Sequence, residues 1–209
     1  MRSRRRRAAR AGPSKAAGGE AAGRGEGAMT AGRSTITDRK DWGTPPVYVS
    51  AVRRFFGGSI CLDPCSGRHS IVHADVEFSL PRQDGLALEW DYPRIYVNPP
   101  YGIDRRRGTR IGDWLQKCAD ASARHRSEVL ALVPVATNTG HWKRHVFGSA
   151  DAVCFLGDTR LRFLADGREG GVGAPMACAM VCWSRRYRRF QEVFGRHGAV
   201  VDLRHLKRR

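Results

Sequence analysis

The chain has 209 residues, of which 41% are hydrophobic, and it carries a formal net charge of +17 at pH 7. This length fits one domain of ordinary size, and no apolar run approaches the roughly 20 residues that a membrane-spanning helix needs. The composition argues against a membrane-spanning protein. It favours a polyanionic partner such as nucleic acid, because basic side chains that bind a polyanion release its condensed counterions.

Residues 1–37 are rich in Arg, Ala and Gly and contain almost no large apolar side chains. We expect a disordered basic arm there, followed by one domain over residues 38–209. Residues 1–40 hold 11 Lys and Arg against 3 Asp and Glu, a net charge of +8, which leaves +9 on the rest of the chain. The arm lacks the apolar centre of a secretory signal. A transit peptide fits the composition; an arm that touches DNA non-specifically, or a true start at Met29, fits it better.

An amphipathic helix is predicted at the start of the ordered part. Thr44 is expected to be its N-cap and Pro45 its first helical residue. Apolar residues at positions 48, 52, 55 and 56 share one helical face. Gly57 and the glycine after it are expected to end the helix.

A strand predicted over Ser59–Leu62 is followed by Asp63, Pro64 and small residues. At the end of a strand, an acid can bind a cationic amine or a hydroxyl, and small side chains let a ligand approach the backbone. A second strand is predicted over Ser70–Phe78. Beyond it, Asp84 can either accept a hydrogen bond from an adenine amino group or simply open an Asp-Gly turn.

The central strand is predicted over Ile95–Val97, and Asn98-Pro99-Pro100-Tyr101 follows it directly. Ligands bind at the carboxyl ends of strands in open α/β sheets. Two prolines make the backbone stiff and leave its carbonyl groups available as acceptors. The Asn98 side-chain oxygen, a proline carbonyl and the Tyr101 ring together suit an exocyclic amine on a planar base. A strand that ends in a proline turn with a core tyrosine is the alternative.

Basic residues after this segment are candidate contacts to DNA phosphates or guanine edges. Four lie in a loop that is predicted at the same edge of the sheet: Arg105, Arg106, Arg107 and Arg110. Lys143 and Arg144, in a predicted short helix, are two more, and solvated surface charge is the alternative for all six. His141 and His145 lie four residues apart, but no Cys or acidic ligand joins them, so no metal site is expected.

The remaining pattern alternates strands with helices, which predicts a three-layer α/β sheet. Strands are expected over residues 128–135, 152–156, 160–164 and 176–183, helices over 112–123 and 185–194, and a Gly-rich loop over 166–173. The six cysteines lack the spacing of a zinc site and are expected to be buried free thiols in a reducing compartment. They are Cys61, Cys65, Cys118, Cys154, Cys178 and Cys182.

Four segments in this order resemble the phage-type DNA N-6-adenine-methyltransferase family: Trp42–Pro46, Leu62–Pro64, Asp84–Leu86 and Asn98–Tyr101. The resemblance continues downstream and covers roughly residues 41–184. It implies S-adenosyl-L-methionine as the cofactor and double-stranded DNA as the substrate. It also implies a Rossmann-like class I methyltransferase fold, in which a three-layer, mostly parallel sheet contains one antiparallel strand.

The resemblance also assigns roles to residues. The catalytic segment that would grip the target adenine is Asn98, Pro99, Pro100 and Tyr101. The cofactor-binding residues would be Trp42, Thr44, Pro45, Asp63, Pro64 and Asp84. Asp75 and Glu77 are candidates for the acid that binds the cofactor ribose.

We therefore expect a site-specific DNA adenine-N6 methyltransferase that flips its target base into the Asn98–Tyr101 pocket. The expected setting is the cytoplasm of a bacterial or phage-infected cell, in a phage, prophage or restriction-modification context. Two alternatives stay open. One is a methyltransferase for another planar amine, such as cytosine N4, an RNA base or a protein glutamine, and the other is a catalytically inactive DNA-binding relative.

Overall fold

The computed structural model of the protein describes residues 42–158, 161–169 and 176–207. The predicted basic arm over residues 1–37 lies outside the described residues. Within the described ranges, no helix combines the length and the apolar character needed to cross a membrane.

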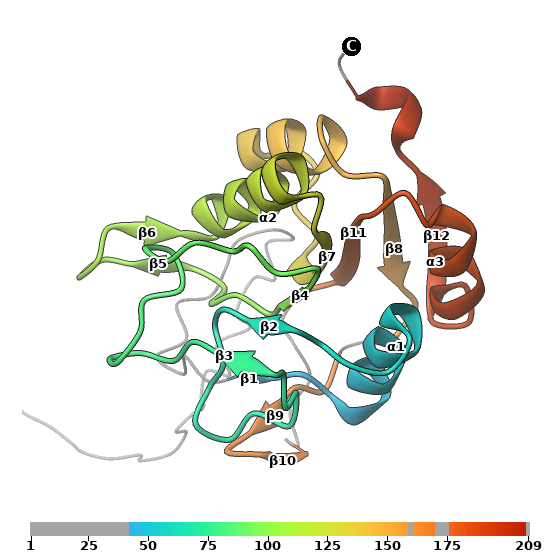
Figure 1. Ribbon diagram of the computed structural model, residues 1–209. Helices are drawn as coiled ribbons and strands as arrows, with labels where there is room; N and C mark the ends of the chain where they lie inside the picture. The colour runs from blue at the N-terminus through green and yellow to red at the C-terminus, as the bar shows by residue number, and fades with distance from the viewer. Residues whose placement is uncertain (1–41, 159–160, 170–175, 208–209) are drawn as a thin grey trace, which may run out of the picture. The chain divides into compact units, whose positions relative to one another are not determined.

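A seven-stranded sheet forms the centre of the described domain (Figure 1). From edge to edge its strands are β12 (Gly198–Asp202), β8 (Ala152–Leu156), β11 (Cys178–Trp183), β7 (Glu128–Pro134), β4 (Arg94–Val97), β2 (Leu62–Asp63) and β3 (Val76–Glu77). Strands β3, β2, β4 and β7 pair in parallel. Strand β11 is antiparallel to β7 and β8, and β12 is antiparallel to β8.

Two strands, β11 and β12, therefore run against the other five, and the prediction of a single antiparallel strand is wrong. The strand that the sequence pattern misses is β12. It lies at an edge of the sheet and none of its residues is buried. An edge strand of this kind lacks the continuous apolar run that marks β7 and β11.

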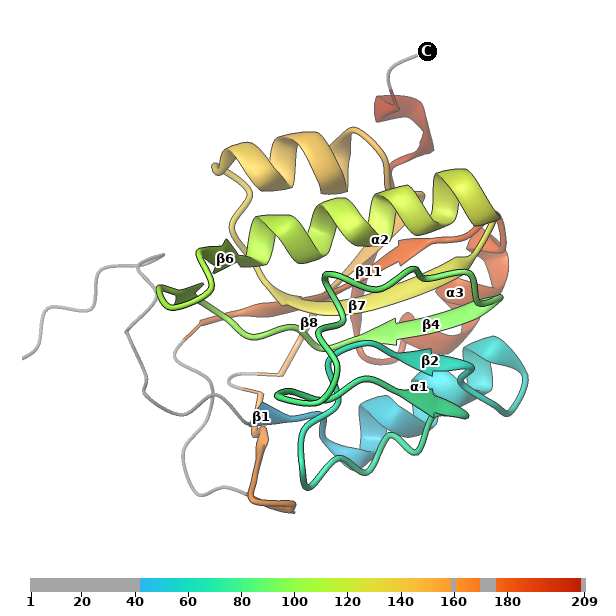
Figure 2. The same cartoon turned by 60° about the vertical axis from the view of Figure 1, so that its left-hand side comes forward.

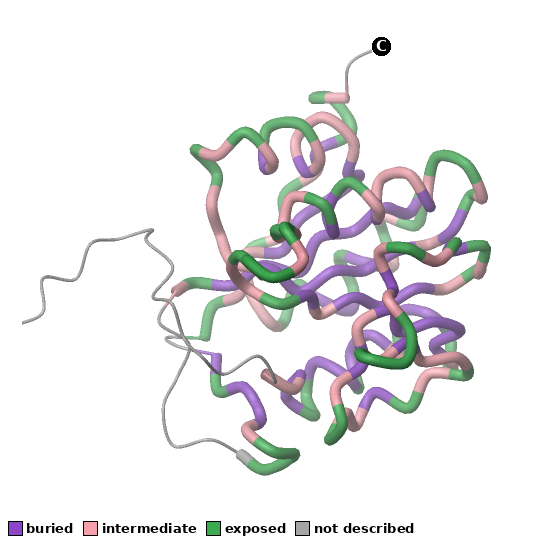
Figure 3. The backbone as a smooth tube through the Cα atoms, turned by 90° about the vertical axis from the view of Figure 1, so that its left-hand side faces the viewer, coloured by how far each residue is buried: buried purple, intermediate pink, exposed green. Residues whose placement is uncertain are grey.

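Helices cover both faces of the sheet, which gives the predicted three-layer α/β arrangement (Figures 1 and 2). Helices α1 (Pro46–Phe56) and α3 (Tyr187–Phe194) pack with one face, and α2 (Ile111–His125) and the π-helix η1 (Trp142–Phe147) with the other. Side chains of β7 alternate between the two cores: Leu130 and Leu132 face α1, whereas Val129 and Val133 face α2. Because both faces are covered, the central strands are buried along their length (Figure 3).

Helix α1 begins one residue later than predicted. Pro45 is the N-cap and Pro46 the first helical residue, and Thr44 makes no capping bond. Pro46, two residues after Thr44, has no N–H group for a capping bond, and the Thr44 hydroxyl oxygen lies 2.7 Å from the Tyr96 hydroxyl oxygen. The helix ends at Gly57, as predicted, with a φ of 86° that favours glycine.

Several short elements frame the sheet. Strands β1 (Trp42–Gly43), β9 (Leu164–Ala165) and β10 (Arg168–Glu169) form a small antiparallel sheet. Strands β5 (Ile103–Asp104) and β6 (Thr109–Arg110) form a hairpin, and η2 (Arg204–Leu206) is a single 3-10 turn.

Two predicted strands are shorter than expected. Of the strand predicted over 70–78, only β3 forms, because the Arg53 guanidinium binds the carbonyl oxygens of Val72 and His73 at 2.7 and 3.0 Å and holds that backbone outside the ladder. Of the strand predicted over 160–164, only Leu164 is in a strand among the described residues. Part of the predicted Gly-rich loop, residues 170–173, lies outside the described ranges, and its first residues form the β9–β10 turn.

Candidate functional site

The carboxyl ends of β2 and β4 place Asp63 and Asn98 next to each other. These strands are parallel neighbours, with Leu62 opposite Ile95. The segment after β4 also lies close to the turn after β2, because the Asn98 backbone acts against the rise that burial causes in the pKa of the Cys65 thiol. Two of the four segments predicted to form the site therefore meet at one edge of the sheet.

Asp63 is buried, with 4% of its surface exposed. Burial raises the pKa of its carboxyl group to about 7, and the nearby Glu77 carboxylate adds to the rise. The Cys65 backbone N–H, which donates to Asp63 Oδ1 at 3.1 Å, acts in the opposite direction. A buried carboxyl group with one backbone donor has capacity to receive a cation or a hydroxyl group from a ligand.

The Asp84–Gly85 turn packs directly on the Asp63–Pro64 turn. A Cβ atom at Gly85 would lie 1.8 Å from the Pro64 carbonyl oxygen, so only glycine fits this contact. The buried Trp90 indole N–H donates to the Gly85 carbonyl oxygen at 2.7 Å and so holds the turn against the core. Asp84 Oδ1 accepts from the Leu86 backbone N–H at 3.0 Å. The third predicted segment thus joins the same edge.

The Asn98 side chain has a fixed orientation. Its Nδ2 donates to the Trp42 carbonyl oxygen at 2.7 Å. Among the described residues, neither Asn98 Oδ1 nor the Pro99 carbonyl oxygen has a hydrogen-bond partner. Two acceptor groups on adjacent residues at the end of β4 are therefore without a partner in the part of the chain that the structure describes.

Trp42 reaches Asn98 because β1 pairs with β9, with Trp42 opposite Ala165 and Gly43 opposite Leu164. A Cβ atom at Gly43 would lie 3.0 Å from Leu164 Cβ, so the two strands are in close contact there. Thr44, which follows, is buried, and its hydroxyl oxygen lies 2.7 Å from the Tyr96 hydroxyl oxygen on β4. Trp42 and Thr44 both contact the segment that leads into Asn98, so the fourth predicted segment also belongs to this site.

An aromatic cluster lies behind the two acceptors. The Tyr101 hydroxyl donates to the Leu132 carbonyl oxygen at 3.1 Å, and the Tyr101 ring meets the rings of Trp42 and Phe163 edge-on, at 6.0 and 5.5 Å between centroids. Trp42 and Phe163 are stacked at 5.2 Å. Burial raises the pKa of Tyr101, so its hydroxyl group stays protonated at neutral pH. The residues at the site provide planar apolar surface as well as acceptors.

Tyr96 and Phe163 are site residues that the sequence did not single out. Tyr96 is hidden in the apolar run of a buried strand and contacts Thr44 only through the folded structure. Phe163 lies within residues 41–184, which carry the family resemblance, and in the strand predicted over 160–164, but neither signal separates it from its neighbours. It is buried, with 5% of its surface exposed.

The predicted DNA-contact residues differ in their surroundings. Arg105, Arg106 and Arg110 are exposed on the β5–β6 hairpin, whereas the Arg107 guanidinium forms an ion pair with the Asp84 carboxylate. Lys143 and Arg144 are exposed on η1. Their neighbour Trp142 is fully buried and its indole N–H donates to the Pro134 carbonyl oxygen at 3.1 Å, which makes it a core residue.

The described residues hold no group of three or more His, Cys, Asp and Glu side chains that could bind a metal ion. Burial and neighbouring positive charge lower the pKa values of His141 and His145. All six cysteines are free, and five of them are buried; Cys65 is partly exposed next to Asp63.

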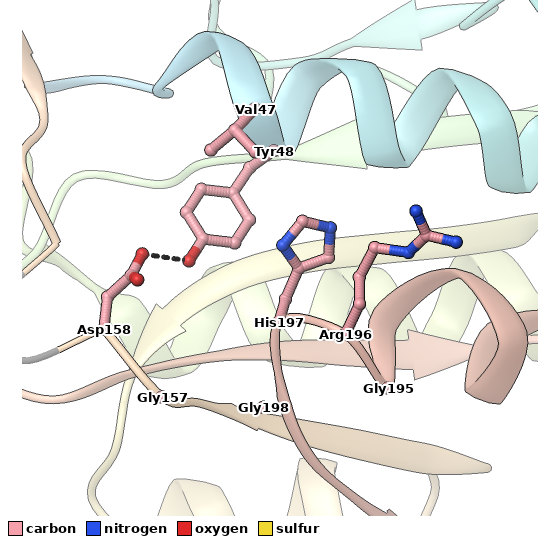
Figure 4. Close-up of a pocket in the computed structure, with 8 residues that line it drawn as sticks. All are labelled: Val47, Tyr48, Gly157, Asp158, Gly195, Arg196, His197 and Gly198. Carbon is pink, nitrogen blue, oxygen red and sulfur yellow. Dashed lines mark hydrogen bonds between the residues drawn. The ribbon is translucent and has the colours of Figure 1, made fainter.

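A surface cavity of about 520 Å³ lies elsewhere, between the start of α1, the end of β8 and the start of β12 (Figure 4). Its lining residues are Val47, Tyr48, Gly157, Asp158, Gly195, Arg196, His197 and Gly198. Tyr48 donates a hydrogen bond to Asp158 across it, and the His197 ring lies between Tyr48 and Arg196. None of the residues predicted to form the site lines this cavity.

Comparison with known proteins identifies the family. The family model for DNA N-6-adenine-methyltransferase (Dam) matches residues 32–209. The chain belongs to this family. This match confirms the membership that the four segments predicted. The description of the family implies that its members methylate adenine in DNA. No curated protein and no solved structure matches the chain.

Membership of the Dam family also bears on the meaning of the site. The matched region contains all four segments that meet at the carboxyl edge of the sheet, from Trp42 to Tyr101. It also contains β9, the strand that holds Trp42 in place. The geometry and the family match therefore refer to the same part of the molecule.

Proposed function

We propose that the protein is a DNA adenine-N6 methyltransferase that uses S-adenosyl-L-methionine and acts on a base flipped out of the duplex. The observation that carries this proposal is the orientation of Asn98. Its amide NH₂ donates to the Trp42 carbonyl oxygen, which leaves Oδ1 and the carbonyl oxygen of the adjacent Pro99 without a partner among the described residues. Two acceptors side by side match the two hydrogens of an exocyclic amine.

In the proposed reaction the two acceptors activate the amine. Adenine N6 is a poor nucleophile, because its lone pair is delocalised into the ring. Hydrogen bonds to Asn98 Oδ1 and to the Pro99 carbonyl would draw the nitrogen toward a tetrahedral geometry and localise that lone pair. The bound cofactor supplies a methyl group on a sulfonium centre. A bond would form between N6 and the methyl carbon as the carbon–sulfur bond breaks and its electron pair stays on sulfur. N6 would then release one proton to water, and because this proton becomes acidic only as positive charge develops, positioning replaces a strong general base.

The aromatic cluster would accommodate the flipped base. Duplex pairing hides N6, so the base must leave the stack, and its planar face needs a planar partner. We propose that Tyr101 supplies that surface, held in place by its hydrogen bond to Leu132 and by the rings of Trp42 and Phe163. Pro100 keeps the segment between Asn98 and Tyr101 stiff.

The cofactor would lie over the turns after β2 and β3. Gly85 and Pro64 pack closely enough to form a continuous backbone surface, and buried Asp63 has capacity for a positively charged group. We propose that Asp63, Pro64 and Asp84 hold the cofactor from this side, and Trp42, Thr44 and Pro45 from the other. Glu77, the residue opposite Asp63 in the β2–β3 ladder, is our candidate for the ribose, in preference to the exposed Asp75.

The order of the strands supports a Rossmann-like class I fold. Asp63 ends β2 and Asn98 follows β4, and these parallel neighbours present their carboxyl ends at the edge where ligands bind in open α/β proteins. We propose that the departures from the expected pattern, the second antiparallel strand β12 above all, lie at the opposite edge and leave this part of the fold intact.

Double-stranded DNA is the proposed substrate and binding partner. Residues 41–209 carry a net charge of +9, and exposed basic side chains lie on the hairpin that follows Tyr101. We propose that Arg105, Arg106 and Arg110 bind phosphates beside the flipped base, with Lys143 and Arg144 as further contacts.

Substitution of Asn98 tests the proposal. The Asn98→Ala variant should lose methyl transfer to DNA almost completely, while its affinity for S-adenosyl-L-methionine in calorimetry stays near that of the unchanged protein. Digestion of the labelled DNA to nucleosides should show N6-methyladenine. Label on cytosine N4, or near-normal turnover in Asn98→Ala, would count against the proposal.

A further inference from the structure

Arg107 differs from the other basic residues of its hairpin. Its side chain is 21% exposed, whereas its neighbours Arg105, Arg106 and Arg110 are exposed. Its guanidinium forms an ion pair with Asp84, and the buried Nη2 atom makes no hydrogen bond to any other described group. An arginine in this position is poorly placed to meet a DNA phosphate, because it already has an anionic partner.

The hairpin is built to direct Arg107 at Asp84. Asp104 Oδ1 accepts from the backbone N–H groups of Arg106 and Arg107, at 3.1 and 3.2 Å, which fixes the tip. Strands β5 and β6 pair on either side of this tip. The hairpin follows Tyr101 directly in the chain, so the ion pair ties the segment after the two acceptors to the Asp84–Gly85 turn.

Asp84 keeps one oxygen available despite this pair. Oδ1 receives both the Leu86 N–H and the Arg107 guanidinium. Oδ2 has no partner among the described residues. The turn itself is held by the contact of Gly85 with Pro64 and by the Trp90 indole. The Leu86 N–H and the Arg107 guanidinium both bind Oδ1, so the Asp84 carboxylate is held through one oxygen and Oδ2 is left for a ligand.

We propose that Arg107 is a positioning residue of the cofactor site, and that its ion pair with Asp84 couples cofactor binding to DNA binding. By holding Oδ1, it orients Oδ2 to accept from the adenine amino group of the cofactor. By holding the hairpin, it places the exposed arginines for DNA, so that cofactor at Asp84 and DNA on the hairpin stabilise the same arrangement. The inference rests on the proposed function, because Asp84 is proposed there to bind the cofactor.

Matched substitutions on the full chain test this role. Without DNA, Arg107→Gln should raise the calorimetric Kd for S-adenosyl-L-methionine about three- to tenfold, and Arg107→Lys should recover part of the loss. Arg106→Gln, the exposed neighbour, is the control and should leave this Kd unchanged. In the absence of cofactor, Arg106→Gln should weaken binding to a DNA duplex and lower the salt slope by about one. Arg107→Gln, which loosens the hairpin but removes no phosphate contact, should weaken DNA binding less and leave the salt slope unchanged.

The coupling has its own readout. Cofactor should tighten DNA binding by about fivefold in the unchanged protein and in Arg106→Gln, and much less in Arg107→Gln. Asp84→Asn combined with Arg107→Gln should raise the cofactor Kd by less than the product of the two single effects. If Arg107→Gln weakens DNA binding as Arg106→Gln does and leaves cofactor affinity unchanged, Arg107 is a DNA contact and the proposal is overturned.

A measurement without any ligand separates this inference from the proposed function. Hydrogen exchange at the amides of residues 103–110 should be faster in Arg107→Gln than in the unchanged protein, and unaltered in Arg106→Gln. Unaltered exchange in Arg107→Gln would refute the tie itself. If instead the exchange result holds but the unchanged protein neither binds the cofactor nor methylates DNA, the proposed function fails and the cofactor role of Arg107 fails with it.

Discussion

The buried carboxyl group of Asp63 should make the stability of the free protein fall as the pH rises. Its pKa is about 7 in the folded protein against an ordinary value of 3.8. The folded state therefore retains a proton that the unfolded chain has released between these two values. The stabilisation is fully present below pH 3.8, decreases through this window, and is lost once the pH has passed 7.

The magnitude follows from the difference of about three pH units. At about 1.4 kcal/mol per unit, the whole term is about 4 kcal/mol, of which about 3 kcal/mol falls between pH 5 and pH 8. Asp63→Asn removes the charge and keeps an oxygen for the Cys65 N–H. Its free energy of unfolding, relative to that of the unchanged protein, should rise by about 3 kcal/mol between pH 5 and pH 8.

Urea unfolding at a series of pH values measures this difference. Asp75→Asn is the matched control, because Asp75 is an exposed carboxyl group that leads into the neighbouring strand. Its stability relative to the unchanged protein should vary little over the same range. A constant difference between Asp63→Asn and the unchanged protein from pH 5 to pH 8 would refute the reasoning, since it would mean that Asp63 ionises as it does in the unfolded chain.

Two further predictions concern the same pair of turns. Gly85→Ala should lower the free energy of unfolding in urea by about 1–3 kcal/mol and weaken cofactor binding. The reason is that a Cβ atom 1.8 Å from the Pro64 carbonyl oxygen forces the two turns apart. Unchanged stability would mean that the turns separate without cost. Cofactor binding should release protons at pH 6.5 and almost none at pH 8.5, because a cationic ligand lowers the pKa of Asp63 from about 7. Calorimetry in two buffers of different ionisation enthalpy measures this release, and equal values at both pH values would contradict it.

The sequence predicts that Asp63 and Asn98 lie at the ends of short apolar strands, and the structure places both at strand ends. That these two strands are neighbours is visible only in the structure, because the apolar pattern does not give the strand order. The three layers follow from the alternation of elements, because β7 and β11 read as strands covered on both faces. Glycine at position 85 matches the predicted Asp-Gly turn, although its contact with Pro64 is not visible in the sequence.

The sequence does not predict contacts between side chains that lie far apart in the chain. Thr44 matches a helix cap by its local pattern, yet its hydroxyl group binds Tyr96, which lies far along the chain. Arg107 has the same composition around it as Arg105 and Arg106, and only the fold of the hairpin distinguishes it. Local propensity cannot separate these cases, because tertiary packing decides each of them.

The pairing of β1 with β9 joins two segments that lie far apart in the chain. The carbonyl group that orients Asn98 belongs to Trp42 in β1, and the strand that secures it is synthesised much later, after β8. A ribosome-bound chain that has been synthesised as far as Tyr101 contains Trp42 and Asn98. It does not yet contain β9, the strand that pairs with Trp42. The orientation of Asn98, on which the proposed function depends, would therefore be completed only when Leu164 and Ala165 pair with Gly43 and Trp42.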